Sequence, residues 1–178
     1  MNRLLILTAL VFTTFLGCKK VDEWTKFDLD YSFETTIEPV LGINLPFDLP
    51  TPTIKTDISE ALEINNSKKD LIEDIRVESL VASIVSPDDE TFSFLNDIEI
   101  SIAAEDLPTL LIAWKHDIPN DVGNELILDL LSDTNLEEYI KKDDIKLEIT
   151  VKTDKILFHD VDLKVDAKFF VDAKVLGI

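Results

Sequence analysis

Few side chains in this sequence could take part in covalent or acid–base chemistry. Cys18 is the only cysteine among the 178 residues, and its thiol is the one soft nucleophile of the chain. His116 and His159 are each followed by an aspartate, Asp117 and Asp160, and a base held by a carboxylate is the start of a catalytic arrangement. The sequence therefore offers acylation or alkylation of a thiol and, at two places, base catalysis.

The catalytic interpretation lacks a nucleophile. No serine lies in a Gly-x-Ser-x-Gly pattern, and Cys18 is accounted for by another role described below. A histidine at a strand end is usually a surface residue. We therefore expect no enzymatic activity, and a hydrolase that uses His116 or His159 is kept as a third hypothesis.

Carboxylates are the most abundant group that could hold an ion. They gather at Asp88-Asp89-Glu90, at Asp143-Asp144 and at Asp160 with Asp162. Ca²⁺ takes six to eight oxygen ligands, but no Asp-x-Asp-x-Asp-Gly loop is present. Zinc-binding histidine or cysteine spacings and glycine-rich phosphate loops are also missing. We expect no metal, no cofactor and no nucleotide, with a calcium site left open.

The residues before Cys18 explain what its thiol is for. Arg3 gives a positive start, and 4–16 is an almost unbroken apolar run that is too short to cross a bilayer, since a membrane helix needs about 20 residues. A positive start and a short apolar core are the pattern of a secretory signal peptide. Here the small residue Gly17 is followed at once by Cys18.

The segment Phe15-Leu16-Gly17-Cys18 resembles the lipobox of bacterial lipoproteins, including those of the Bacteroidota. It matches at Gly17 and Cys18, whereas Phe15 and Leu16 are bulkier than usual. The resemblance implies cleavage between Gly17 and Cys18, attachment of lipid to the Cys18 thiol, and anchoring in the outer membrane, in a leaflet that stays undecided. The alternatives are an ordinary cleaved secretion signal or a buried helix that contains a cysteine.

Composition excludes further classes of function. The formal net charge of −19 repels phosphate backbones, so we expect no nucleic-acid binding. The same charge opposes lying flat on anionic lipids, so membrane contact depends on the anchor. We expect three parts: a signal peptide at 1–17, a lipidated tether at 18–26 and a single β-sandwich domain at 27–178.

Hydrophobic periodicity gives the fold class. Alternation of apolar and polar residues over 27–37, 145–152 and 161–175, where Phe170 alone breaks the polar face, indicates half-buried strands. We expect an all-β, antiparallel sandwich of about seven strands, with two or three short helices at 58–64, after 67 and at 134–142. Three finer expectations are a hairpin of 75–85 with 92–102, a strand at 126–131 buried on both faces, and a bulge near Phe169-Phe170.

The segment 39–54 interleaves four prolines with apolar residues, which predicts a sheet edge or a loop. Its apolar residues form a possible partner-docking strip: Leu41, Ile43, Leu45, Phe47 and Leu49. Alternatively, they simply cover the domain's own core. We expect a lipid-anchored, non-catalytic binding or accessory subunit with an envelope protein as partner. The alternative is a carrier of an apolar ligand held in the core.

Overall fold

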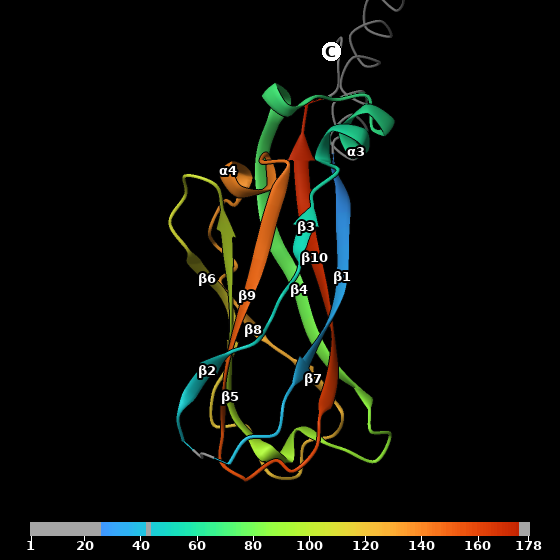
Figure 1. The fold of residues 1–178 in the computed structure, drawn as a ribbon. Helices are drawn as coiled ribbons and strands as arrows, with labels where there is room; N and C mark the ends of the chain where they lie inside the picture. Colours follow the sequence, from blue (N-terminus) through green and yellow to red (C-terminus); the bar gives the residue numbers. More distant parts are fainter. Residues whose placement is uncertain (1–25, 42–43, 175–178) are drawn as a thin grey trace, which may run out of the picture.

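The computed structural model describes residues 26–41 and 44–174, which form two antiparallel sheets packed face to face (Figure 1). The predicted β-sandwich is confirmed. The first sheet has four strands in the order β1 (Lys26–Ile37), β10 (Val161–Ala173), β4 (Ile72–Ser86) and β7 (Glu125–Ile127). Along β10, buried and half-buried residues alternate without interruption, as the sequence pattern requires.

The second sheet has six strands. Its order is β2 (Pro46–Asp48), β9 (Asp144–Thr153), β5 (Leu95–Ala104), β6 (Leu110–Lys115) and β8 (Asp129–Leu130), and β3 (Thr53–Lys55) also pairs with β9. The proline-rich segment thus supplies two short edge strands, as predicted, because proline cannot donate to a central ladder. Side-chain bonds fasten this segment across the sandwich: Tyr31 donates to the Thr56 carbonyl at 2.6 Å and Thr35 to that of Pro50 at 2.6 Å.

The core lies between the two inner faces. The first sheet contributes fully buried residues such as Ile37, Leu80 and Phe169, and the second contributes Ile100 and Ile112. Burying one such side chain stabilises the fold by about 1.5–3 kcal/mol before entropic costs. One continuous apolar cluster therefore holds both sheets together.

Two predicted local arrangements are wrong. Segments 75–85 and 92–102 do not form a hairpin: β4 belongs to the first sheet and β5 to the second, and the chain crosses between them through a 3₁₀ turn, η3 (Phe92–Phe94). The segment 126–131 is not one strand buried on both faces. It divides at Leu128 into β7 and β8, which lie in different sheets, and Ile127 is exposed.

A register shift falls between Lys168 and Phe169, where a bulge was expected. The extra residue, however, is on the partner strand, because Lys168 faces Ser79 while Phe169 faces Val77. Two further register shifts in the same pairing also leave one residue of β4 each without a partner residue on β10. The three extra residues are Glu73, Glu78 and Val85.

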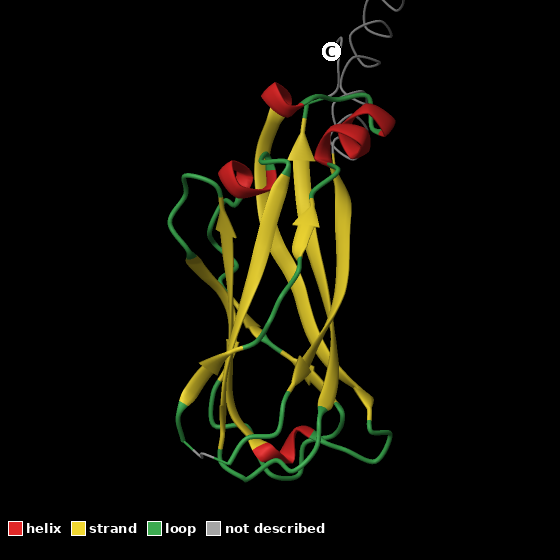
Figure 2. Ribbon diagram, viewed as in Figure 1, coloured by secondary structure: helices red, strands yellow, loops and turns green. Residues whose placement is uncertain are grey.

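The helices are short and gather mainly at one end of the sandwich (Figure 2). They are α3 (Ile58–Ile64), the 3₁₀ turn η2 (Lys69–Leu71) and α4 (Glu137–Ile140). The span of α3 is as predicted, but no side chain caps it, since Asp57 adopts a left-handed backbone (φ 47°). No side chain caps α4 either, and just before it Asn135 Oδ1 accepts a hydrogen bond from the backbone N–H of Glu137 at 2.9 Å.

We call the end of the sandwich that carries α3, η2 and α4 the helical end. It is formed by 56–71, 104–109 and 131–143 together with the start of β1 at Lys26. The opposite end, where β1, β4, β6 and β9 finish, is the loop end (Figure 1). It consists of the described segments 38–41, 44–45, 86–94, 116–124 and 154–160.

Candidate functional site

Backbone hydrogen bonds join the four segments of the loop end. Val40 and Leu157 exchange both of their bonds at 3.0 Å, and Asn44 donates to Thr153 at 2.7 Å. Three more backbone hydrogen bonds connect the segments. The backbone N–H of Phe92 donates to the Gly123 carbonyl, that of Ile118 to Asn96 and that of Asp154 to Phe94. The segments therefore form one connected surface.

Apolar side chains project from this surface. Leu157 is buried, and in an extended pairing its sequence neighbours point the opposite way. Ile156 is accordingly 46% exposed and Phe158 is 78% exposed, while Leu41, beside Val40, is 77% exposed. Because the bridge between Val40 and Leu157 is antiparallel, Leu41 follows Val40 on the side where Ile156 precedes Leu157.

The structure separates the five residues of the predicted docking strip. Leu41 is exposed as stated, and Leu45 is 67% exposed. Phe47 is half-buried and packs on the core, and Leu49 is buried, so these two cover the core. Ile43 lies outside the described residues. Both interpretations of 39–54 thus apply to different parts of it.

Ile156 and Phe158 were missed by the sequence reasoning, although a signal exists. The inward positions of β9 and β10 are odd-numbered, from Ile145 to Thr153 and from Val161 onward. Ile156 and Phe158 are apolar residues at even positions in the connection between these strands. An apolar residue out of phase with both flanking strands is expected to face solvent.

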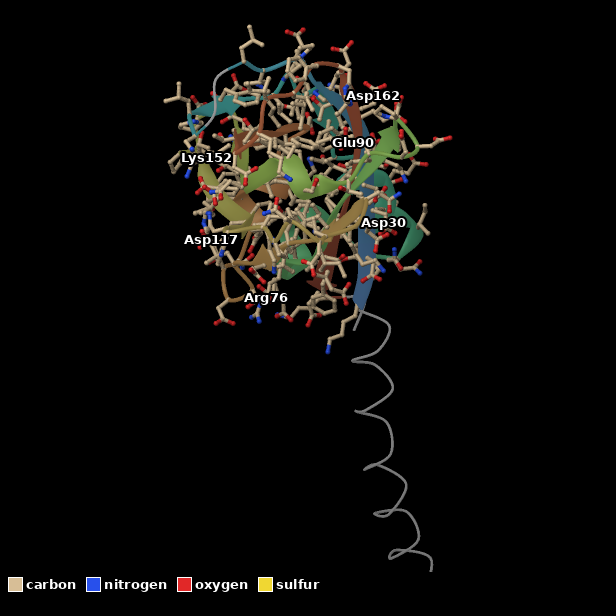
Figure 3. All side chains as sticks on the ribbon, turned by 90° about the horizontal axis from the view of Figure 1, so that it is seen from below. Asp30, Arg76, Glu90, Asp117, Lys152 and Asp162 are labelled. Carbon is tan, nitrogen blue, oxygen red and sulfur yellow. The ribbon has the colours of Figure 1, made fainter. Side chains whose placement is uncertain are left out.

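We call Leu41, Leu45, Ile156 and Phe158 the apolar patch. The loops around it are acidic. Segments 38–45, 86–91, 116–124 and 154–160 hold one lysine, Lys155, against eight acids: Glu38, Asp88, Asp89, Glu90, Asp117, Asp121, Asp154 and Asp160. Six of the eight are exposed, all but Glu90 and Asp154. Figure 3 looks onto this end, with Glu90 and Asp117 labelled among its carboxylates.

Asp97, at the start of β5, organises the polar side of this end. It accepts a hydrogen bond from the backbone N–H of Asp117 at 3.1 Å and one from the Lys152 ammonium at 3.2 Å. Burial raises the pKa of Asp97, but these two bonds and one from Asn96 outweigh burial and hold its pKa below the ordinary value. Asp97 is therefore ionised at neutral pH and fixes the 116–124 segment to β5 and β9.

Both histidines lie at the loop end and face carboxylates. Nδ1 of His116 lies 3.6 Å from Oδ1 of Asp97, and Nε2 of His116 lies 3.7 Å from Oε1 of Glu99. His159 Nε2 lies 2.8 Å from Glu90, which connects the 154–160 segment to the 86–91 turn. In each of these contacts the imidazole faces a carboxylate at the surface, and not a nucleophile.

Acidic residues that are close in the sequence bind different side chains instead of converging on one point. Asp143 pairs with Lys69 and Asp144 with Lys55, while Asp162 accepts a hydrogen bond from Thr36. Within 26–41 and 44–174, no group of three or more histidine, cysteine or acidic side chains is arranged to hold a metal ion.

Four surface pockets lie on other parts of the described residues. The largest of four, about 440 Å³, sits on the outer face of β1 and β10 beside Asp30, Asp166 and Lys168. Hydrogen bonds from Lys164 and Ser32 hold the pKa of Asp166 below its ordinary value. Charged side chains contribute to the lining of each of these four pockets.

The expected signal peptide, cleavage site and lipid attachment at Gly17 and Cys18 lie outside the described residues. Within the described part of the chain, every helix is too short or too polar to cross a bilayer. No family model matches the chain, and neither does any curated protein.

Solved structures match the chain at low similarity. A decameric BFDV capsid protein is 9% identical, with 84% of this chain and 98% of that chain covered and a TM-score of 0.43. The Cocksfoot mottle virus structure is 9% identical over 85% of each chain (TM-score 0.30). A carbohydrate-binding module of the β-sandwich superfamily is 12% identical over 88% of this chain and 58% of that one (TM-score 0.32). Likeness of this degree does not bear on function.

Proposed function

We propose that this protein is a lipid-anchored outer-membrane lipoprotein that acts as a non-catalytic binding or accessory subunit of an envelope complex. Lipid on Cys18 attaches it to the membrane, and the loop end contacts an envelope protein. The observation that carries the docking role is the exposure of Leu41 and Leu45 in a segment whose backbone is fastened at Val40 and Asn44. Exposed apolar residues on a fixed backbone are typical of interaction surfaces.

The positions of the two ends support this arrangement. β1 begins at Lys26 at the helical end, eight residues after Cys18, and runs to Ile37 at the loop end (Figure 1). A twelve-residue strand spans about 40 Å at 3.3 Å per residue. The loop end that carries the apolar patch thus lies about one strand length from Lys26, the first described residue after the proposed tether.

Two variants test the two halves of the proposal. Cys18→Ser should remove the lipid attachment site and cause unprocessed chain to accumulate; a variant that is still cut to mature size and stays bound to the membrane would contradict the anchor. Leu41→Ser with Leu45→Ser should abolish crosslinking to an envelope protein in cells. Ile64→Ser with Ile127→Ser, which alters two exposed residues away from the patch, is the matched control and should crosslink like wild type.

A further inference from the structure

We infer that the loop end recognises a polypeptide segment that carries both apolar and basic side chains. This inference rests on the proposed function and specifies the chemistry of the partner. It depends on three features of the loop end that occur together: an apolar patch, a nearly complete absence of lysine in the surrounding loops, and a fixed backbone.

The apolar patch requires an apolar partner. Leu41, Ile156 and Phe158 cluster around the bridge between Val40 and Leu157, and Leu45 follows on the same segment. Their side chains leave water when an apolar surface covers them, and each buried square ångström contributes about 25 cal/mol. Aromatic and aliphatic side chains of a peptide are suited to this contact.

The surrounding charges select the partner's sign. Eight acids and one lysine occupy the loops around the patch, so an acidic partner is repelled and a basic one is attracted. The helical end differs, since Lys68, Lys69, Lys141 and Lys142 accompany its acids. Net charge alone would not distinguish the ends, whereas the shortage of lysine around an apolar patch is confined to the loop end.

The same charges disfavour two other occupants. A second copy of this chain, joined patch to patch, would bring two acidic rims together. An anionic bilayer would be repelled by the carboxylates, and lipid on Cys18 would hold the opposite end at the membrane. A basic, apolar protein segment meets neither obstacle.

A fixed backbone reduces the entropic cost of binding. Backbone hydrogen bonds at Val40, Asn44 and Leu157 hold described residues beside the patch, and Glu90 holds His159, the residue after Phe158. Segments already ordered before binding lose less freedom when they bind.

The test is selection of peptides from a displayed random library on the full chain, immobilised through a C-terminal tag. Because β10 ends at the helical end, this attachment leaves the loop end free. The same library is selected on wild type without prior depletion, and the retained peptides are then measured on Leu45→Ser with Phe158→Ser, a double variant of unchanged charge. The retained peptides should be rich in both apolar and basic residues, and should bind wild type at least about tenfold tighter than the double variant, a difference of about 1.4 kcal/mol.

The control variant Ile64→Ser with Ile127→Ser should bind these peptides like wild type. Retained peptides without basic residues, or binding that the double variant preserves, would overturn the inference. Vesicles of phosphatidylcholine and phosphatidylglycerol provide a further arm: capture that requires Leu45 and Phe158 would assign the patch to lipid instead. Concentration-dependent dimerisation lost in the double variant would assign it to a second copy. None of these results depends on Cys18, so failure here is distinct from failure of the anchor.

Discussion

At the helical end, apolar side chains outside the strands turn into the core, whereas at the loop end four of them turn into solvent. Ile58 and Leu62 of α3 and Ile140 of α4 are buried, and of the large apolar residues there Ile64 is the exposed one. At the loop end Leu157 is buried, but its neighbours Ile156 and Phe158 are not. Similar residues thus close the fold at one end and remain available for contacts at the other.

The first prediction concerns closure of the helical end. Leu62→Ala should lower the free energy of unfolding by about 2–5 kcal/mol, because it leaves a cavity beneath α3. Urea unfolding of the full chain, followed by circular dichroism, measures the change. Ile64→Ala, two residues later and exposed, should change it by less than about 0.5 kcal/mol. Equal losses in both variants would mean that α3 does not close the core.

The second prediction concerns the polar framework of the loop end. Asp97→Asn should cost about 1–2 kcal/mol at pH 7, since it weakens bonds from Lys152 and the Asp117 N–H to a charged acceptor. The pKa of Asp97 is lowered in the folded state, so its contribution is present above about pH 4 and is lost as pH falls through the folded pKa.

The difference between wild type and Asp97→Asn should therefore shrink in urea unfolding below pH 4. Asp88→Asn, an exposed acid at the same end, serves as the control and should show little effect at either pH. A difference that stays constant with pH would indicate that Asp97 acts through packing rather than through its charge.

The smallest effect is predicted for the apolar patch itself. Phe158→Ser should change the free energy of unfolding by less than about 0.5 kcal/mol, because the side chain is already in solvent. The adjacent Leu157→Ala should cost about 2–5 kcal/mol. If Phe158→Ser destabilised the chain as much as Leu157→Ala, Phe158 would belong to the fold and the contrast between the two ends would fail.

Long alternating strands were predictable because their period is a local property. The strands β1, β9 and β10 appear where the sequence places them, and so does α3. Strand partners were not predictable, since β4 and β5 are adjacent in the chain but their pairing is decided by distant strands. Strands of two or three residues, such as β7 and β8, have no measurable period, so about seven strands were expected where the described chain forms ten.

The candidate site was partly predictable for the same reason. Leu41 and Leu45 stand out in the sequence because prolines interrupt any strand around them. Phe47 and Leu49 look alike in the sequence but pack inward, since pairing with β9 decides which way they face. Ile156 and Phe158 join the patch only through the bridge to Val40, a contact across more than 110 residues that no local pattern encodes.

The pairing of β4 with β10 has a consequence for how this sequence can change over time. All three extra residues fall on β4 and all three are exposed, whereas β10 stays in step with β1 throughout. An insertion in an uninterrupted strand would invert the inward and outward positions of everything beyond it. Here one strand absorbs length changes for its neighbour, so lineages can gain or lose a residue at Glu73, Glu78 or Val85 while the core keeps its phase.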